Sequence, residues 1–584
     1  MWGLGMPGWK GIFADFTSWE GWAHFKLEYP AAATPNNIFG LAEYLAALAM
    51  FLVILTTSDY RYRYRLSLTR INLQRAGFWV TALIGASLLL VDIWFANGLP
   101  VPKLFSNQAD LKAALGAAFM ALLLRVFHVA LISPPVFNRW NAKRFFSVHY
   151  SLIHEGNAEK LIIVAEELRR SAGRLVSSAS KIGKTPDSKV SDDSKFAYNF
   201  LLLIGDMRFC RLVVDKVPSL PLVLFDEFQK HPRADLPVFQ FARNIGQQFI
   251  LNLSSSYYQE DSGYYSGLLG YDQPVTRAVF GNYRFIEQCA ESGASPLEVD
   301  LHGELTGEQT QGACRAGLAF LKGYLEATKG RRHSHSYALH RLLAALGHTA
   351  GGVHVLDGKT DYYEHPSYHR LKAVTDFVHK AISLIDEHAD PPESIKPHER
   401  WHDVYDGIAD LIIEVVMAVS SVKSPDGTAW AIQHNAVWGQ IFGFSDSRAS
   451  RVIRKKVSRL LYNEIRRMDE WPNFKGARAL GFCLLVLGLS PINRRRGYRK
   501  EDSPLQALAA RWASKNYVRL LRDHPEVAAA CLMGCVAYDN VGHRFVKTFA
   551  DHTRKEPQKE YLKVAQPPRK SPKAARRAQP RQIG

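Results

Sequence analysis

The sequence predicts a membrane protein built mainly from α-helices, with three N-terminal transmembrane helices followed by a large, mostly helical cytoplasmic region. Three apolar stretches lie within the first 135 residues, and no comparable stretch follows them. Beyond them, apolar residues recur at helical spacing, as at Leu161, Val164, Ala165 and Leu168, while strand-like alternation is scarce. We therefore expect a small membrane module that carries a much larger body on one side of the bilayer.

Each apolar stretch has about 20 residues, which suffices for a helix to cross roughly 30 Å of hydrocarbon. The stretches are 38–57, with Glu43 inside it, 77–96, with Asp92, and 111–132, with Arg125 and His128. If the helices of several copies meet, these groups would form an acidic outer ring and a basic inner ring of a pore, and such rings set ion selectivity. The alternatives are buried core helices, or polar groups near helix ends that reach interfacial water.

Basic residues around the spans indicate the orientation in the membrane. The first loop contains Arg61, Arg63, Arg65, Arg70 and Arg75, and the segment after the third span contains Arg139, Lys143 and Arg144. Because positive residues are retained on the cytoplasmic side, we expect the N-terminus outside and everything after residue 135 in the cytoplasm. Residues 1–36 hold four tryptophans, which favours an outer interfacial segment or a packed cap.

The pattern divides the rest of the chain into further parts. After the segment 1–36 and the transmembrane module 37–135, we expect a helical cytoplasmic domain at 145–360, a second helical region at 361–545 and a disordered tail at 546–584. The first helical domain contains a Gly- and Tyr-rich stretch at 257–283, which predicts a long ordered loop. Residues 541–584 hold 12 Lys or Arg against 3 Asp or Glu, so the tail is suited to contact anionic lipid headgroups or nucleic acid.

One predicted helix of the body combines an apolar stripe with many cations. In the segment 449–468, Val452, Ile453, Val457 and Leu461 share one face. The cations around this face are Arg448, Arg451, Arg454, Lys455 and Arg459, and a second basic cluster contains Arg494, Arg495, Arg496 and Tyr498. Such a helix can follow a phosphate backbone, and the tyrosine could stack on a base. The alternative is a solvated helix face beside a basic loop.

The sequence also offers an enzymatic hypothesis. His398, Glu399 and His402 have the spacing of a zinc hydrolase, in which two histidines on one helical face bind zinc and the glutamate acts as general base. Pro397 directly precedes the motif and Arg400 lies within it, so the context does not favour a metal. A nuclease with scattered carboxylates is a further alternative. We expect neither a resident metal nor a cofactor.

The spans at 38–57, 77–96 and 111–132, the basic helical body and the expected oligomeric pore together resemble the membrane effectors of bacterial anti-phage defence. Among these, the chain looks most like the channel-type effector of the Hailong system, a family held closed by single-stranded DNA. The resemblance is architectural and covers the whole chain, and it transfers no binding residue. It implies the bacterial inner membrane, a homo-oligomer such as a tetramer, and single-stranded DNA or an oligonucleotide as the partner.

The sequence thus predicts an oligomeric channel gated by a cytoplasmic nucleic acid or nucleotide. Three mostly apolar spans per chain cannot enclose a hydrated path alone, so a pore requires several chains. A membrane-anchored hydrolase or nuclease is the second hypothesis, and a non-catalytic receptor or scaffold is the third. The channel predicts ligand-dependent conductance, whereas the enzyme predicts bound metal or a cluster of carboxylates around a pocket.

Overall fold

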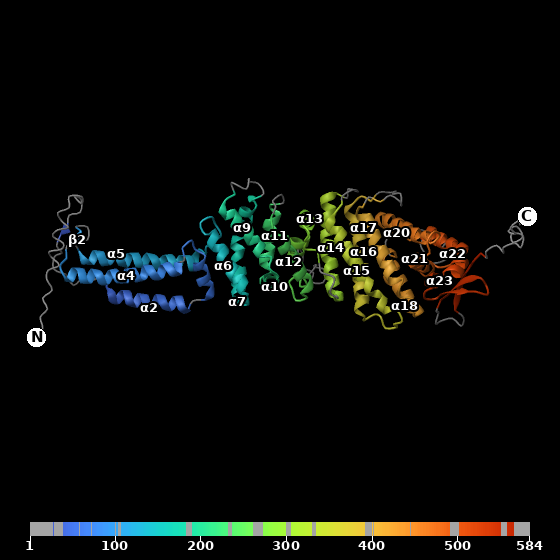
Figure 1. Cartoon of the computed structure of the whole chain (residues 1–584), viewed down its shortest axis with the longest axis horizontal. Coiled ribbons are helices and arrows are strands. Elements are labelled where there is room, and N and C mark those ends of the chain that lie inside the picture. The colour runs from blue at the N-terminus through green and yellow to red at the C-terminus, as the bar shows by residue number, and fades with distance from the viewer. Residues whose placement is uncertain are drawn as a thin grey trace, which may run out of the picture. The chain divides into compact units, whose positions relative to one another are not determined.

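The computed structural model describes residues 27–28, 39–57, 59–71, 73–99, 101–102, 107–182, 190–231, 236–260, 273–298, 305–329, 335–391, 400, 402–443, 446–490, 502–549 and 557–565. These residues are mainly helical, as the sequence predicts (Figure 1). The chain divides into two compact units. Unit 1 comprises Met1–Leu175 and Val190–Ala197, and unit 2 comprises Val176–Lys189 and Tyr198–Gly584. The boundary that we expected near residue 360 therefore lies inside unit 2.

Unit 1 begins with a group of apolar helices. They are α2 (Leu41–Thr57), α4 (Leu73–Ala96) and α5 (Gln108–Phe127), and the π-helix η4 (His128–Ile132) extends α5. The short helix α3 (Tyr60–Ser67) joins α2 to α4, and strands β1 (Leu27–Glu28) and β2 (Val101–Pro102) pair antiparallel. Tyr44, Ile84, Leu88 and Phe119 form a buried cluster among these helices. Tyr44 packs so closely on Gly85 that a side chain there would collide with its ring.

Among the described residues, two helices are long and apolar enough to cross a membrane, at Arg75–Ala96 and Gln108–Ile132. Helix α2 has 17 residues, or about 25 Å at 1.5 Å per residue, which is less than roughly 30 Å of hydrocarbon. Residues 39 and 40 belong to the predicted first span but precede the helix. The first of the three expected spans is therefore shorter than predicted.

The remainder of unit 1 is helical and packs around aromatic residues. It contains α6 (Ala142–Glu155), α7 (Ala158–Leu168) and the 3-10 helix η5 (Arg169–Ser171). Phe137 and Phe145 are both buried and meet edge to face, with ring centroids 5.4 Å apart. The division between the two units falls within α8 (Ala172–Ala179) and α9 (Asp192–Leu203).

Unit 2 continues the helical pattern. Its first part contains α10 (Met207–Lys216), α11 (Ser219–Gln229), α12 (Phe239–Leu251), η8 (Thr276–Phe280), α13 (Tyr283–Glu291), α14 (Gly307–Thr328), α15 (Tyr337–Ala350), η9 (Gly351–Leu356) and α16 (Pro366–His388). Helix α14 starts with a capping box, in which the side chains of Thr306 and Gln309 each accept the other's backbone N–H. Helix α16 packs along α14.

The second part of unit 2 surrounds helix α17 (Val404–Val419), most of which is buried, and which packs against α15 and α20. The other helices of this part are α18 (Asp426–Trp430), η10 (Ala431–Gly439), α19 (Gln440–Phe442), α20 (Arg448–Arg467), α21 (Phe474–Val486), α22 (Ser503–Asp523) and α23 (Pro525–Ala530).

A three-stranded antiparallel sheet follows these helices, which the sequence did not predict. Strands β3 (Val536–Asp539), β4 (Arg544–Phe549) and β5 (Gln558–Lys563) pair in chain order. The expected disordered tail at 546–584 is therefore wrong for 546–549 and 557–565. Phe545 and Lys547 of β4 point inward, and Glu560 of β5 accepts the Leu489 N–H at 3.0 Å.

The Gly- and Tyr-rich stretch is partly described. Tyr257 donates its hydroxyl hydrogen to the Gly312 carbonyl at 2.8 Å, and Tyr258 donates to the Ile250 carbonyl at 2.7 Å. Both tyrosines thus hold this stretch against the backbone of neighbouring helices. Residues 276–280 form the π-helix η8 instead of loop, and residues 261–272 lie outside the described part of the chain.

Candidate functional site

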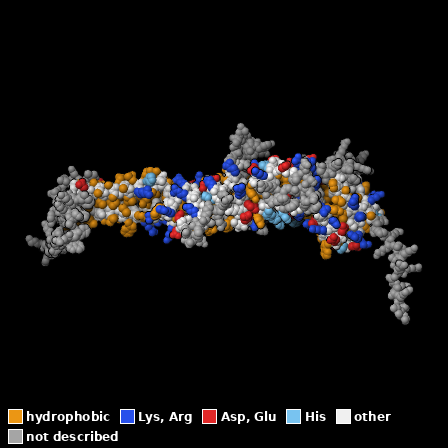
Figure 2. All heavy atoms as spheres, turned by 90° about the horizontal axis from the view of Figure 1, so that it is seen from above, with side chains coloured by type: hydrophobic (Ala, Val, Ile, Leu, Met, Phe, Trp, Pro, Cys, Tyr) orange, Lys and Arg blue, Asp and Glu red, His pale blue; other side chains and the backbone are white. Residues whose placement is uncertain are grey.

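Helices α4 and α5 present large apolar side chains to the outside. The most exposed include Phe78, Trp79, Leu83, Leu90, Ile93, Leu124 and Ile132, and Trp79 is 71% exposed. Figure 2 shows hydrophobic side chains gathered over this part of the chain, next to a zone of Lys and Arg. In the most apolar stretches of the two long helices, only 28% and 17% of the residues are buried. Core helices of soluble proteins bury their apolar stripe. An exposed apolar surface of this size is instead typical of helices that contact another apolar environment.

A charged pair that sequence reasoning missed lies between the two long helices. Lys112 of α5 is buried, and its Nζ lies 2.5 Å from Oδ1 of Asp92 on α4. Gln108 Nε2 donates to the same Oδ1 at 2.8 Å. Because a buried ammonium group needs a partner, the pair fixes how α5 packs on α4. Asp92, which we expected in an acidic ring, therefore has partners within its own chain.

Glu43 also has a local partner. One of its carboxylate oxygens accepts the Gly40 N–H at 2.9 Å, which caps the start of α2. Arg125 and His128 are both exposed, near the point where α5 becomes the π-helix η4. Among the described residues, Arg125 makes no ion pair. Of the four predicted pore residues, Arg125 and His128 are thus the two whose side chains are exposed on the outside of the helices.

The apolar helices join the rest of unit 1 through Arg65 of α3, which is buried. Its Nη1 donates to the Ala130 carbonyl of η4 at 2.7 Å, and its Nη2 donates to Oε1 of Glu167 on α7 at 2.5 Å. One guanidinium therefore ties the end of the second long apolar helix to helix α7. We call Tyr64, Arg65, His149 and Glu167 the junction cluster.

Histidine and tyrosine complete the junction cluster. The Tyr64 hydroxyl lies 2.7 Å from His149 Nε2, and His149 Nδ1 lies 2.7 Å from the Phe145 carbonyl oxygen. Because a carbonyl only accepts, Nδ1 carries the hydrogen and Nε2 accepts from Tyr64. Burial lowers the pKa of His149 from 6.5 to about 4, although the hydrogen bond to the Phe145 carbonyl opposes this shift. His149 is therefore neutral at neutral pH.

Further contacts surround the junction cluster. Arg61 pairs with Glu166. Arg144 Nε donates to the Ser67 carbonyl at 2.5 Å, and Asn141 Nδ2 donates to the Leu68 carbonyl at 3.3 Å. Three of the basic residues that we used to predict orientation, Arg61, Arg65 and Arg144, thus also hold α3 against α6 and α7. Nothing in the local sequence signals these pairings, because the partners lie far apart along the chain.

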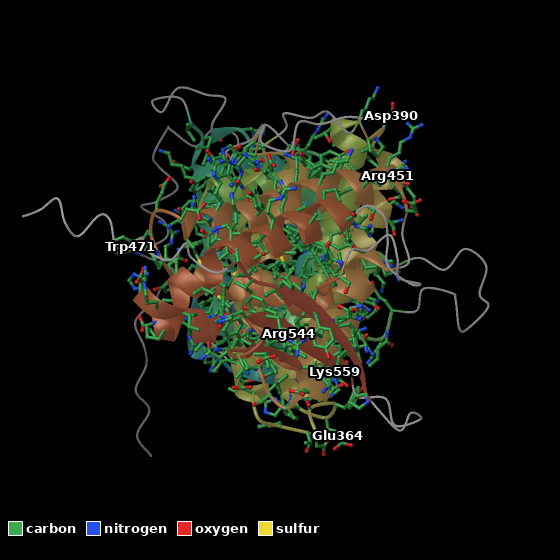
Figure 3. All side chains as sticks on the ribbon, turned by 90° about the vertical axis from the view of Figure 1, so that its right-hand side faces the viewer. Glu364, Asp390, Arg451, Trp471, Arg544 and Lys559 are labelled. Atoms are coloured by element: carbon green, nitrogen blue, oxygen red, sulfur yellow. The ribbon has the colours of Figure 1, made fainter. Side chains whose placement is uncertain are left out.

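Helix α20 presents part of the predicted cationic face to solvent. Arg448, Arg451 and Lys455 are exposed and Arg459 is half-buried, and their spacing of three or four residues places them along one stripe. Figure 3 shows Arg451 at the surface, on the same side as Asp390. Arg448 lies 3.6 Å from that aspartate, which is itself exposed. Ser447 caps the helix by accepting the Ser450 N–H.

Arg454 is wrongly placed in the predicted nucleic-acid face. It is buried, donates from Nη2 to the Phe442 carbonyl at 2.7 Å, and has Nε 3.8 Å from Oδ1 of Asp502. Its guanidinium also lies over the Phe442 ring. Lys456 is similarly buried, with Nζ 2.5 Å from Oδ1 of Asp406. Because α16, α17, α21 and α22 all pack on α20, only a narrow stripe of this helix is open to a ligand.

The second predicted cluster, Arg494, Arg495, Arg496 and Tyr498, lies outside the described residues, as do His398 and Glu399. His402 is described and does not belong to a helix: its φ is +52°, and helix α17 begins only at Val404. The helical face that the zinc motif requires is therefore missing at His402. In the described part of the chain, no three His, Cys, Asp or Glu side chains are placed to hold a metal ion.

Comparison with protein-family models finds no match for this chain, and neither does comparison with curated proteins or with solved structures.

Proposed function

We propose that this protein is the pore-forming effector of an anti-phage defence system, an oligomeric membrane channel gated by a cytoplasmic nucleic acid or nucleotide. The observation that carries this proposal is the exposed apolar surface of α4 and α5, with Arg125 in it. A surface of this kind suits the hydrocarbon of a bilayer, in which helices satisfy their own backbone polar groups. Helix α2 packs on α4 and would complete a three-helix module. The setting in defence rests on the architectural resemblance alone.

Arg125 supports an oligomeric pore over a simple anchor. Arg125 lies seven residues before the end of the predicted span, and the cost of an arginine that faces lipid rises with depth to about 3 kcal/mol at the centre of a span on insertion scales. Within one chain it has no ion-pair partner among the described residues, so a water-filled space between copies would remove this cost. His128, one turn further on, would face the same space. Several copies are required, because one three-helix module leaves no room for a hydrated path.

The basic residues support an orientation in the bacterial inner membrane with the N-terminus outside. One basic group lies at and before the start of α4 and contains Arg61, Arg63, Arg70 and Arg75. A second group follows α5 and η4 and contains Arg139, Lys143 and Arg144. Both groups would lie on the cytoplasmic side, where positive residues are retained. The part of the chain that follows the membrane helices would then be exposed to cytoplasmic ligands.

The ligand site in this proposal is the stripe of Arg448, Arg451, Lys455 and Arg459 on α20, with Arg494–Arg496 and Tyr498 as support. Exposed cations at helical spacing suit single-stranded DNA or another oligonucleotide. The junction cluster is where movement of the body would reach the pore, since Arg65 contacts both η4, at Ala130, and α7. A gate requires an element with two arrangements, and a π-helix at the end of a pore helix is a suitable one.

The test is conductance of the purified full-length chain in planar bilayers, with and without a single-stranded oligonucleotide on the body side. We expect an oligomer in detergent and a conductance that the oligonucleotide changes. A monomer, or a conductance that ignores both oligonucleotides and nucleotides, would contradict the proposal. Metal-dependent cleavage of a substrate without conductance would favour the hydrolase or nuclease instead.

A further inference from the structure

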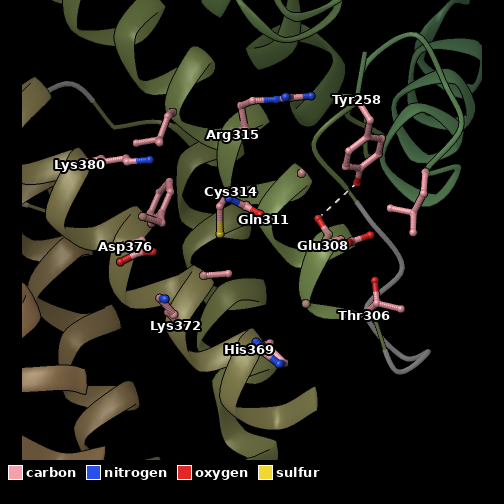
Figure 4. A pocket seen from close by; sticks show the side chains of 16 residues that line it. Tyr258, Thr306, Glu308, Gln311, Cys314, Arg315, His369, Lys372, Asp376 and Lys380 are labelled. Carbon is pink, nitrogen blue, oxygen red and sulfur yellow. Dashed lines mark hydrogen bonds between the residues drawn. The ribbon is translucent and has the colours of Figure 1, made fainter. Parts of the chain in front are cut away.

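A broad groove lies between helices α14 and α16 of unit 2, and no residue of helix α20 lines it. Its volume is about 840 Å³, which falls within the range of small-ligand sites. One wall is formed by Glu308, Gln311 and Arg315 of α14, and the other by Lys372, Asp376 and Lys380 of α16. Figure 4 shows the two lysines on one side, and Arg315 and Tyr258 on the other, with Cys314 between them.

The cations of this groove have no carboxylate partner in ion-pair contact within the described part of the chain. Lys372 and Lys380 are exposed, and neither makes an ion pair among the described residues. They lie eight residues apart on α16, so they share a face about 12 Å apart along the axis. Asp376 lies between them, and its carboxylate already accepts Gln440 Nε2 at 2.9 Å. The α16 wall therefore offers two open ammonium groups to an anion.

Arg315 adds a third, more ordered cation. Its Nη2 donates to the Tyr257 carbonyl, and its guanidinium lies 3.8 Å from the centroid of the Tyr257 ring. Its Nε is buried and has no hydrogen-bond partner in the described part of the chain. Arginine held in this way by an aromatic ring and a carbonyl keeps a fixed position, as recognition of a phosphate requires.

Part of the groove is apolar and aromatic, beside polar lining residues such as Thr306, Glu308 and His369. Leu318, Ala373 and Phe377 line it, together with half-buried Tyr258. Tyr258 can approach α14 because Gly312 has no side chain: a Cβ there would lie 2.2 Å from the tyrosine hydroxyl. The hydrogen bond from that hydroxyl to the Ile250 carbonyl holds the ring in place. A flat apolar group of a ligand could pack against these side chains, beside the three cations.

We propose that this groove binds a mononucleotide, with its phosphates on Lys372, Lys380 and Arg315 and its base against Tyr258 and Phe377. Cations on the walls and an aromatic, apolar lining match a ligand that is charged at one end and flat at the other. The site would add a small-molecule input to the channel. That consequence rests on the proposed function, whereas the binding itself does not.

The test is calorimetric titration of the full-length chain in detergent with ATP and, separately, with inorganic pyrophosphate. We expect ATP to bind, and pyrophosphate to bind more weakly because it lacks the base. In the double variant Lys372→Glu/Lys380→Glu, the Kd for ATP should rise by about tenfold or more, since each charge-assisted contact to a phosphate contributes strongly. The matched control Lys322→Glu/Lys359→Glu reverses two exposed lysines that do not line the groove, and its Kd should equal that of the parent chain.

Thermal unfolding of each variant accompanies the titration. If the charge reversal lowers the Tm, Lys372→Gln/Lys380→Gln replaces it and should still weaken ATP binding. The proposal is overturned if neither probe binds the parent chain, or if Kd is unchanged in a folded groove variant. It is also overturned if a single-stranded oligonucleotide occupies the groove through the two lysines while ATP does not. Conductance is not part of this experiment, so a chain that binds ATP but never conducts would refute the channel and leave the groove proposal standing.

Discussion

Arg65 and Glu167 of the junction cluster form a buried pair, with side chains 8% and 7% exposed, and this burial predicts how sensitive the junction is to a single change. Glu167→Gln would leave the Arg65 guanidinium buried without a counter-charge, which typically destabilises by about 3–5 kcal/mol. We expect a clear fall in the Tm of the full-length chain in detergent. The double variant Arg65→Met/Glu167→Met removes both charges and should recover most of the loss.

The neighbouring residue supplies the control. Glu166 pairs with Arg61, and both side chains are more than a third exposed. Exposed ion pairs contribute about 0–1 kcal/mol, so Glu166→Gln should leave the Tm almost unchanged. Equal effects of the two glutamine substitutions would show that Glu167 is not buried against Arg65 in the folded protein.

His149 predicts a pH dependence of the same junction. Burial lowers its pKa from 6.5 to about 4, so between these values the unfolded chain binds a proton that the folded chain excludes. Stability should therefore fall as the pH is lowered from 6.5 to about 4, by about 3 kcal/mol in total. His149→Gln keeps an acceptor for Tyr64 and should flatten the dependence of Tm on pH. His154→Gln, which changes an exposed histidine on the same helix, should reproduce the parent's slope. An equal slope for parent and His149→Gln would contradict the assignment.

At the scale of the element, helix α20 shows what the sequence can and cannot predict. Its observed bounds, Arg448–Arg467, nearly match the predicted segment 449–468, because apolar spacing reports one buried face directly. Spacing does not report how many neighbouring helices cover the remaining faces. Arg454 was therefore assigned to the open cationic face, although it is buried beside Asp502, which is distant in sequence. Lys456, which the prediction did not include, is likewise buried, with Asp406 as its partner.

The strands β3 to β5 were missed for a different reason. Strand β4 alternates inward and outward, but one of its inward residues is Lys547, which pattern reasoning counts as polar. Lys547 is fully buried, donates to the Leu485 carbonyl at 2.6 Å, and lies over the Trp430 ring. A buried lysine makes an inward position of a short strand look like an outward one, so the alternation of apolar and polar residues is lost. Nothing in the neighbouring sequence shows that the lysine is buried.

The exposed stripe of α20 predicts how oligonucleotide binding responds to salt. Replacing Arg448, Arg451 and Lys455 by Gln removes three exposed cations without touching the buried Arg454. If each contacts one phosphate, the slope of log K against log salt concentration should flatten by about 0.7 per contact on a single strand, or about 2 in total. The matched control replaces Arg208, Arg211 and Lys216 of α10, which are also exposed, and should keep the parent's slope. Identical slopes for both triple variants would remove α20 as the binding surface.

At the scale of the whole molecule, the sequence predicted a helical protein with apolar N-terminal helices, because long apolar runs and helical spacing are local properties. It did not predict how distant residues combine into sites. Lys112 stands within the third predicted span, yet only the fold shows that it meets Asp92. Tyr258, Lys372 and Lys380 line the same groove between α14 and α16, and no sequence motif marks this combination. The sequence shows which residue types occur where along the chain, whereas only the folded structure shows which distant residues contact one another.

Arg125 offers the decisive test of the proposed oligomeric channel. Leucine keeps the length and the apolar character of the helix and removes the charge, so Arg125→Leu should express and assemble like the parent chain. If Arg125 lines the pore, removing several positive charges from a ring should shift the reversal potential toward cation selectivity, because a basic ring repels cations. Arg208→Gln changes an exposed arginine of α10 instead and should leave the reversal potential unchanged. Identical reversal potential and open probability for Arg125→Leu and the parent would place Arg125 away from the ion path. A contact between copies would then be the other way to offset the cost of its charge in the proposed membrane helix, and cross-linking of single-cysteine variants next to Arg125 would detect that interface.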